Sequence, residues 1–173
     1  MISNTLVIKY CPSCGVDRFK RVAEKLFECG GCGFQYFHNS AAAAAVILEH
    51  KDNILLTVRK FDPHRGSYDL PGGFIDYNET GEEGLIREIK EELNLTVEKV
   101  RYFGSYPNEY LYKEVLYHTL DLVFIASISN TDGIRVADDV MNFVWIKPKD
   151  IDLNSVAVKS IKSALTVYVN KLS

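Results

Sequence analysis

The segment over residues 70–95 constrains the fold more than any other part of the chain. It begins with the turn Pro71-Gly72-Gly73, where glycine lets the backbone approach a ligand or a metal closely. Thr80 and Glu83 then match the S/T-x-x-E capping box, which fixes where a helix begins. The sequence therefore predicts a helix over residues 81–93 that starts a short connection after this turn.

The predicted helix has an apolar face and an acidic face. Spacings of three and four residues place an apolar set on one side, where we expect it to pack against a sheet: Leu85, Ile86, Ile89 and Leu93. The same spacings gather an acidic set: Glu88, Glu91 and Glu92. Like charges repel on a bare helix, whereas Mg²⁺ and Mn²⁺ bind carboxylate oxygens. A solvated acidic face is the alternative, but the glycine turn and the position of Arg87 beside Glu88 favour a metal site.

These residues together resemble the Nudix box, G-x5-E-x7-R-E-U-x-E-E-x-G-U. The resemblance begins at Gly73, passes through Glu79 and Arg87, and ends at Leu95. It holds at every fixed position except Asn94, which stands where the family has glycine. Asparagine adopts the left-handed conformation more readily than other non-glycine residues, so we expect this departure to cost little.

The resemblance implies an α/β/α sandwich with a mixed sheet and a hydrolase that acts on nucleoside diphosphates linked to another moiety. It implies Mg²⁺ or Mn²⁺ as cofactor, with Glu88, Glu92 and the carbonyl of Gly72 as ligands. Glu91 is then a further ligand or the base that activates water. Arg87 and Glu79 would orient the catalytic glutamates, and Gly73 would allow close contact with the substrate.

Two further expectations come from the same resemblance. Relatives often add an acidic ligand from a later loop, and Asp139 in the run Ala137-Asp138-Asp139-Val140 is the candidate here. A surface turn is the alternative for this run. Many relatives also build their pocket across a dimer, so the resemblance allows a homodimer.

All four cysteines lie near the N-terminus in two C-x-x-C-G motifs that are separated by fourteen residues: Cys11, Cys14, Cys29 and Cys32. Four thiolates in this arrangement suit one tetrahedral Zn²⁺. The glycine after each second cysteine suits a tight turn in which N–H groups point toward sulfur. Iron and a redox pair are the alternatives. The pattern resembles a zinc ribbon, which usually has a structural role.

A zinc ribbon ahead of a Nudix domain is similar to the NADH pyrophosphatase branch. That branch has a further N-terminal domain and an S-Q-P-W-P-F-P-x-S element after the box. This sequence keeps only the S-x-P start of the element, at Ser105 and Pro107. The resemblance implies a dinucleotide-type substrate such as NADH, NAD⁺ or ADP-ribose. A MutT-like triphosphate pyrophosphatase and a non-catalytic nucleotide sensor are the alternatives, although a pure sensor has no need of a full glutamate cluster.

The remaining patterns predict a layered α/β domain. The run Ala41–Ala45 leads into Val46-Ile47-Leu48 and indicates a buried strand, with a helix as the alternative. Further strands are predicted over 54–58, near 68–74, near 97–105, over 117–126 and over 143–146. A second helix is predicted over 155–172 from the spacing of Val158, Ile161, Leu165, Tyr168 and Leu172. We predict a zinc ribbon over 1–38 and a Nudix domain over 39–173.

Composition narrows the partners and the compartment. The formal net charge of −3 gives no support to a nucleic-acid surface. No apolar run is long enough for a membrane span, and residues 1–6 do not begin a signal peptide. Paired cysteines suit metal binding in a reducing compartment, so we expect a cytoplasmic protein.

Several other residues could contact a nucleotide. Tyr106 and Tyr110 belong to a tyrosine cluster that could stack on a base, although packing within strands and loops is the favoured interpretation. Arg59 could contact phosphate, as could Arg65, which lies with His64 in an expected surface loop. Phe37 could join the pocket, but the ribbon core is the favoured place for it.

Overall fold

The computed structural model describes residues 8–112, 115–137 and 139–172, except for the side chain of Tyr112. The described residues form two compact units. One unit contains the chain up to Ser40 together with residues 110–118, and the other contains residues 41–109 and 119–172. Asp138 and residues 1–6, which the sequence predictions mention, lie outside the described residues. The predicted division into residues 1–38 and 39–173 remains our proposal.

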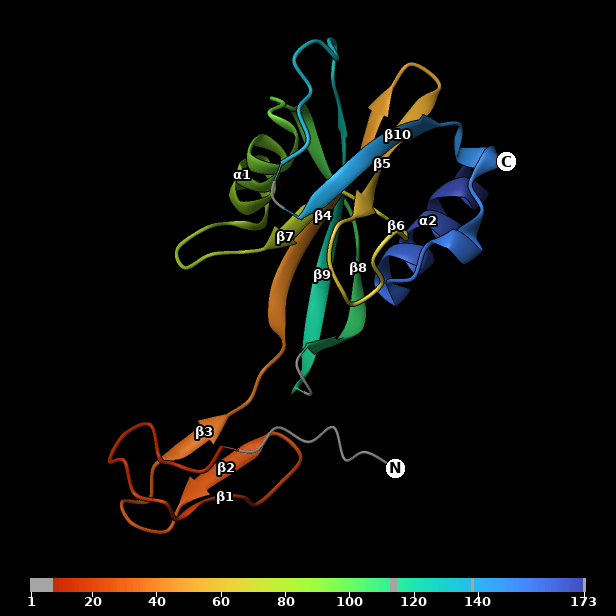
Figure 1. The fold of residues 1–173 in the computed structure, drawn as a ribbon. Helices are drawn as coiled ribbons and strands as arrows, with labels where there is room; N and C mark the ends of the chain where they lie inside the picture. Colours follow the sequence, from red (N-terminus) through yellow and green to blue (C-terminus); the bar gives the residue numbers. More distant parts are fainter. Residues whose placement is uncertain (1–7, 113–114, 138, 173) are drawn as a thin grey trace. The chain divides into compact units, whose positions relative to one another are not determined.

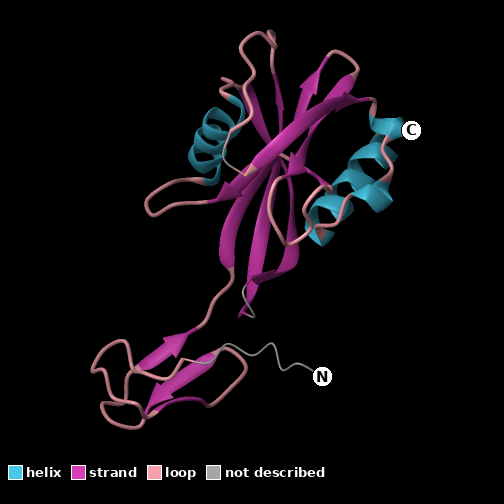
Figure 2. Cartoon of the chain, viewed as in Figure 1, coloured by secondary structure: helices cyan, strands magenta, loops and turns pink. Residues whose placement is uncertain are grey.

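The second unit is built on a mixed seven-stranded sheet, drawn as arrows in Figures 1 and 2. Its strands are β4 (Ala41–His50), β5 (Asn53–Arg59), β6 (Tyr68–Asp69), β7 (Gly72–Phe74), β8 (Glu98–Tyr112), β9 (Val115–Ser127) and β10 (Val140–Ile146). The order is β10-β5-β4-β9-β8, with β6 paired to β5 and β7 paired to β4. The central strand β4 is antiparallel to β5 and β7 and parallel to β9.

Two helices cover opposite faces of this sheet (Figure 1). They are α1 (Gly81–Leu93) and α2 (Lys159–Lys171), and the short 3-10 turns η1 (Pro148–Asp150) and η2 (Leu153–Ser155) precede α2. Each helix covers its own buried apolar cluster, one with Leu85 and Ile89 of α1 and the other with Ile161 and Leu165 of α2. The α/β/α architecture expected from the resemblance is therefore confirmed.

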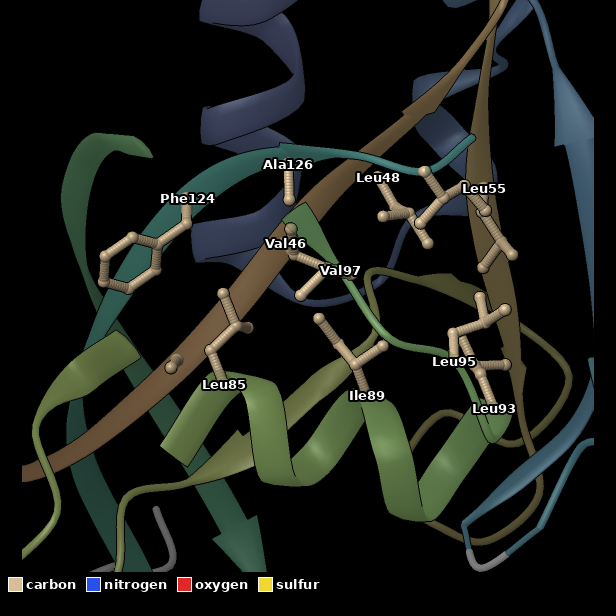
Figure 3. Packing of buried hydrophobic residues seen from close by; sticks show 12 residues of the cluster. Val46, Leu48, Leu55, Leu85, Ile89, Leu93, Leu95, Val97, Phe124 and Ala126 are labelled. Atoms are coloured by element: carbon tan, nitrogen blue, oxygen red, sulfur yellow. The ribbon is translucent and has the colours of Figure 1, made fainter. Parts of the chain in front are cut away.

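Helix α1 begins and ends as the sequence predicts. Thr80 and Glu83 form both hydrogen bonds of the capping box, and Asn94 adopts the left-handed conformation at φ 55° and ψ 29°. Figure 3 shows how the side chains of Leu85 and Ile89 point from α1 toward the sheet. Ile86 was expected on this face, but it is 43% exposed. One residue turns a helix by about 100°, so Ile86 lies beside the stripe that Leu85 and Ile89 form at a spacing of four.

The alanine run forms the first half of β4, so its interpretation as a strand is confirmed and the helical alternative is wrong. Ala44 lies opposite Gly73 and Ala45 opposite Gly72 on β7. Gly72 has a φ of 142°, and a Cβ there would stand 2.1 Å from the carbonyl oxygen of Ala44. Glycine is therefore required where β7 approaches the central strand.

Other boundaries differ from the predictions. The strand expected near 68–74 is divided into β6 and β7 by Leu70 and Pro71, and the strands expected near 97–105 and over 117–126 are longer. Helix α2 starts at Lys159 rather than at residue 155. Val156 is instead extended and buried, and it forms a β-bridge with Tyr68. The helix was predicted from residue 155, but this β-bridge holds Val156 in an extended conformation.

The first unit contains a small antiparallel sheet of β1 (Phe19–Arg21), β2 (Leu26–Cys29) and β3 (Gln35–Phe37). Its buried cluster consists of Cys11, Phe19, Phe27 and Cys29. Phe37, expected in this core, is exposed, and Tyr36 packs against the cluster instead because side chains alternate along β3. We call residues 8–40 the cysteine module. Among the described residues, neither α1 nor α2 has the length and apolar run needed to cross a bilayer.

Candidate active site

One guanidinium organises the acidic face of α1. Arg87 donates to both carboxylate oxygens of Glu79, from Nε at 2.8 Å and from Nη2 at 2.9 Å. Its Nη1 donates to Glu88 at 2.9 Å and to Glu91 at 3.1 Å. Nη2 also donates to the carbonyl oxygen of Phe74 at 3.0 Å. Arg87 thus connects three glutamates to the end of β7, as the resemblance implied for an orienting residue.

The two glycines of the turn contact two different glutamates. The N–H of Gly72 donates to Oε2 of Glu92 at 3.0 Å. A Cβ on Gly73 would stand 2.5 Å from the carboxyl carbon of Glu88, so this carboxylate lies directly against the backbone of β7. The turn therefore brings the backbone into contact with the acidic face, while its predicted approach to a ligand or a metal stays a prediction.

Glu92 is only 8% exposed, so it lies deeper than the sequence indicated. Burial is the largest cause that raises the pKa of Glu92 to about 8, and the nearby carboxylates of Glu88, Asp69 and Asp139 contribute to this rise, against the lowering by the Gly72 N–H. Asp139 therefore acts on the site electrostatically, and its carbonyl oxygen accepts a hydrogen bond from the N–H of Lys60. Its role as a metal ligand stays a prediction.

Sequence reasoning missed Asp69, which stands on β6 three residues before Gly72. Oδ2 of Asp69 forms an ion pair with Nη1 of Arg59 at 2.7 Å, and Oδ1 accepts the N–H of Leu70 at 2.9 Å. Burial raises the pKa of Asp69 despite the charge of Arg59. Aspartate is depleted in strands, so an aspartate directly before Leu-Pro-Gly-Gly is the signal that could have identified it.

We expect the protein without Mg²⁺ or Mn²⁺ to lose stability as the pH rises from about 4.5 to about 8. Because the pKa of Glu92 is raised from 4.5 to about 8, the folded protein keeps a proton in this range that the unfolded chain has lost. Asp69 contributes in the same direction, while the lowered pKa values of Glu79 and Glu83 act oppositely at lower pH.

The measurement is the thermal unfolding midpoint across this pH range for the wild type and for Glu92→Gln. Glutamine does not titrate, so the variant should show a flatter dependence. Parallel curves for the two proteins would contradict the assignment of the effect to Glu92.

The predicted substrate-binding residues lie in different places. Arg59 is paired with Asp69 near the turn. Tyr106 packs against the cluster on the α2 face, together with Phe103, whereas α1 covers the other face. Tyr110 belongs to the first unit. The structure thus brings Arg59 and Gly73 to the acidic site, while contact of the tyrosines with a nucleotide stays a prediction.

The four cysteines converge in the cysteine module. Their sulfur atoms all lie within 4.8 Å of one another, and Cys11 and Cys29 are buried while Cys14 and Cys32 are exposed. The N–H groups of Gly31 and Cys32 point at the sulfur of Cys29 at 3.3 and 3.4 Å. They lower the pKa of Cys29 to about 6, with the N–H of Cys32 contributing most. This geometry suits one tetrahedral metal ion.

Gly15 and Gly33, which follow the second cysteine of each motif, both have a φ of 73°. This left-handed conformation confirms the tight turns that the two glycines predicted.

Comparison with known proteins identifies the family of the chain. Residues 38–165 match the NUDIX domain model. The chain belongs to the Nudix hydrolase family. The NAD-capped RNA hydrolase NudC of Photorhabdus laumondii is 26% identical over 167 residues, which cover 94% of this chain and 62% of that relative. The ADP-ribose pyrophosphatase of Methanocaldococcus jannaschii is 33% identical over 106 residues, which cover 61% of each chain.

A solved structure extends the likeness to the fold. The crystal structure of a NUDIX hydrolase from Nitrosomonas europaea aligns with a TM-score of 0.74 and 25% identity, and the alignment covers 95% of this chain and 92% of that chain. The alignments cover 62% of the NudC relative and 61% of the ADP-ribose pyrophosphatase, so this chain spans less than two thirds of either relative's length.

Three carboxylates of the Nudix box, Glu79, Glu88 and Glu91, are arranged around Arg87, whereas Glu92 accepts the N–H of Gly72. Among the described residues, the four cysteines are the only group of three or more potential metal ligands whose ligand atoms all lie within 4.8 Å of one another. Glu88 and Glu91 are instead joined through Nη1 of Arg87. The charge of Arg87 offsets part of their mutual repulsion.

Proposed function

We propose that this protein is a metal-dependent hydrolase that cleaves the diphosphate linkage of a dinucleotide-type substrate such as NADH, NAD⁺ or ADP-ribose. The single observation that carries the proposal is the arrangement of the Nudix box. Arg87 holds Glu79, Glu88 and Glu91, while Glu92 is fixed to the N–H of Gly72. Such a site can bind a hard cation and a phosphate group at one place.

The residues fit a divalent cation. Glu92 is buried beside other carboxylates, which raise its pKa together with burial, so its anionic form lacks compensating charge. Glu88, Glu92 and the carbonyl of Gly72 would hold Mg²⁺ or Mn²⁺, with Asp139 as a further ligand. When bound, the ion supplies charge neutralisation for the diphosphate and lowers the pKa of water so that hydroxide is available at neutral pH.

The side chains of the site orient this chemistry. Arg87 fixes Glu79 through two hydrogen bonds and Glu88 and Glu91 through one each, and glutamates held in this way would orient the attacking water. A glutamate of the box, Glu91 or a neighbour, accepts the proton of this water. The new P–O bond replaces the bridging P–O bond of the diphosphate. The products are a nucleoside monophosphate and a second phosphorylated fragment.

The substrate class is supported by the relatives. One is named an NAD-capped RNA hydrolase and another an ADP-ribose pyrophosphatase, and the names of both refer to compounds with a diphosphate linkage. The first alignment covers the cysteine module as well as the Nudix domain, since it spans 94% of the chain. A triphosphate pyrophosphatase is the alternative within the same chemistry. A non-catalytic sensor is disfavoured because it would not need the full set of glutamates.

The test is a comparison of kcat/KM under one metal condition. The panel contains NADH, ADP-ribose, a short NAD-capped RNA and several triphosphates, including oxidised ones. We expect a dinucleotide-type substrate to be preferred and to yield a nucleoside monophosphate. A triphosphate preferred by about tenfold or more, about 1.4 kcal/mol of transition-state stabilisation, with release of pyrophosphate, would refute the substrate class but not the Nudix chemistry. Efficient cleavage only of the RNA would contradict the expectation that nucleic acid is not a partner.

The cysteine module completes the proposal. Cys11, Cys14, Cys29 and Cys32 would hold one structural Zn²⁺, because their sulfur atoms converge and hydrogen bonds favour the thiolate of Cys29. Thiolates remain available for metal only where they stay reduced, so we propose the cytoplasm as the compartment.

A further inference from the structure

A largely buried ion pair stands beside the Nudix box. The side chain of Asp69 is 14% exposed and that of Arg59 is 23% exposed, and their charged atoms are 2.7 Å apart. Arg59 also donates from Nε to the carbonyl oxygen of Pro63 at 3.1 Å. Desolvation makes such pairs weak sources of net stability. Their geometry is nevertheless well defined, because each partner has a second hydrogen bond.

The ion pair fixes the start of the segment that ends at the glycine turn. Asp69 accepts the N–H of Leu70 at 2.9 Å, so the carboxylate is tied to the backbone of the next residue. The carbonyl of Pro71 accepts the N–H of Val46 at 3.0 Å. The N–H of Gly72 then donates to Glu92. The segment is therefore held at three successive places, and the one nearest its start depends on Arg59.

The sheet supports this segment through two short strands, with Asp69 paired to Thr57 and Gly72 paired to Ala45. Strand β6 has two residues and β7 has three. Leu70 and Pro71 between them lie outside both strands. A loss of the side-chain contacts of Asp69 would therefore let Gly72 shift, and this residue carries both the proposed carbonyl ligand and the N–H that contacts Glu92.

We infer that Asp69, anchored by Arg59, is a positioning residue that sets the orientation of the Gly72 backbone toward Glu92 and toward the divalent cation. The inference rests on the proposed function insofar as the cation is concerned. It assigns Arg59 to the support of the site, where the sequence predicted a phosphate contact. Outer partners that orient metal ligands typically change metal affinity or activity by about 10–100-fold when they are removed.

The experiment measures Mn²⁺ binding by electron paramagnetic resonance, without substrate, on the full chain with its zinc content determined. Asp69→Ala is expected to weaken Mn²⁺ binding by at least about tenfold. Asp69→Asn should recover part of this loss, because its amide oxygen can still accept from Arg59, although its NH2 group cannot accept the N–H of Leu70. Asp152→Ala is the matched control, since Asp152 accepts the N–H of Asn154 in the same way in η2. The control should bind Mn²⁺ like the wild type.

The outcomes separate positioning from a direct effect of charge. Wild-type affinity in Asp69→Ala would overturn the inference. Equal losses in Asp69→Ala and Asp69→Asn would also overturn it, because the negative charge rather than the hydrogen bonds would then matter. If Asp69→Ala does not fold, the double variant Arg59→Met, Asp69→Ala leaves no unpaired buried charge and should show the same loss.

Failure of this inference differs from failure of the proposed function. Wild-type protein that binds Mn²⁺ but cleaves no nucleotide would refute the proposed function, while the comparison of the Asp69 variants would still decide the positioning role. Wild-type protein that binds no Mn²⁺ would overturn both.

Discussion

Glu92→Gln and Glu88→Gln are each expected to lower kcat by at least about a hundredfold, the lower end of what a positioned acid–base group contributes. Glutamine keeps the size and one carbonyl oxygen of glutamate but loses the charge. In Glu92→Gln that oxygen can still accept the N–H of Gly72, which in the wild type donates to Oε2 of Glu92 at 3.0 Å. The fold should therefore survive while the proposed binding of the cation and the activation of water are lost.

The assay compares both variants with the wild type at saturating substrate in Mg²⁺. Glu82→Gln is the matched control, because Glu82 lies in the first turn of the same helix and is exposed. It should keep full activity. Near-wild-type kcat in both Glu88→Gln and Glu92→Gln would show that the proposed catalytic role is wrong, whatever the substrate.

The parts of the fold set by local sequence were predictable. Helix α1 begins at its capping box and ends at the left-handed Asn94, and each of these features depends on only a few neighbouring residues. The glycine turn could also be predicted from the sequence, because only glycine tolerates a φ of 142°, the value at Gly72. The acidic face of α1 and its orientation by Arg87 followed from helical spacing combined with the resemblance to the Nudix box.

The parts set by tertiary contacts were not predictable. Val156 lies within the helix predicted over 155–172, but it is extended and forms a bridge with Tyr68. Ile86 is apolar but lies outside the stripe that faces the sheet. Asp69 is separated by ten residues from Arg59, and only the pairing of β5 with β6 brings the two together. Spacing along one helix indicates nothing about such contacts between strands.

The cysteine module has a small core of its own. Its buried cluster is Cys11, Phe19, Phe27 and Cys29, and this cluster shares no residue with the two clusters of the Nudix domain. Two of its four members are proposed zinc ligands, so apolar burial alone contributes little to its stability. Domains with so few core residues usually need a metal or disulfides to fold. All four cysteines are free thiols in the structure and their sulfur atoms converge, which fits the proposed metal cross-link.

Cys29→Ser is accordingly expected to reduce the zinc content well below one ion per chain and to unfold the cysteine module. Structural Zn²⁺ contributes roughly 10–16 kcal/mol to the folding of small zinc modules, far more than a core of this size can replace. Elemental analysis measures the zinc, and amide hydrogen exchange should show protection lost over residues 8–40 but kept in β4 and α1, whose clusters are separate.

Gln35→Ala, at an exposed position in β3, is the control and should retain zinc. Purified wild-type protein that contains iron or no metal would contradict the zinc assignment, and loss of protection in α1 as well would contradict the independence of the two cores.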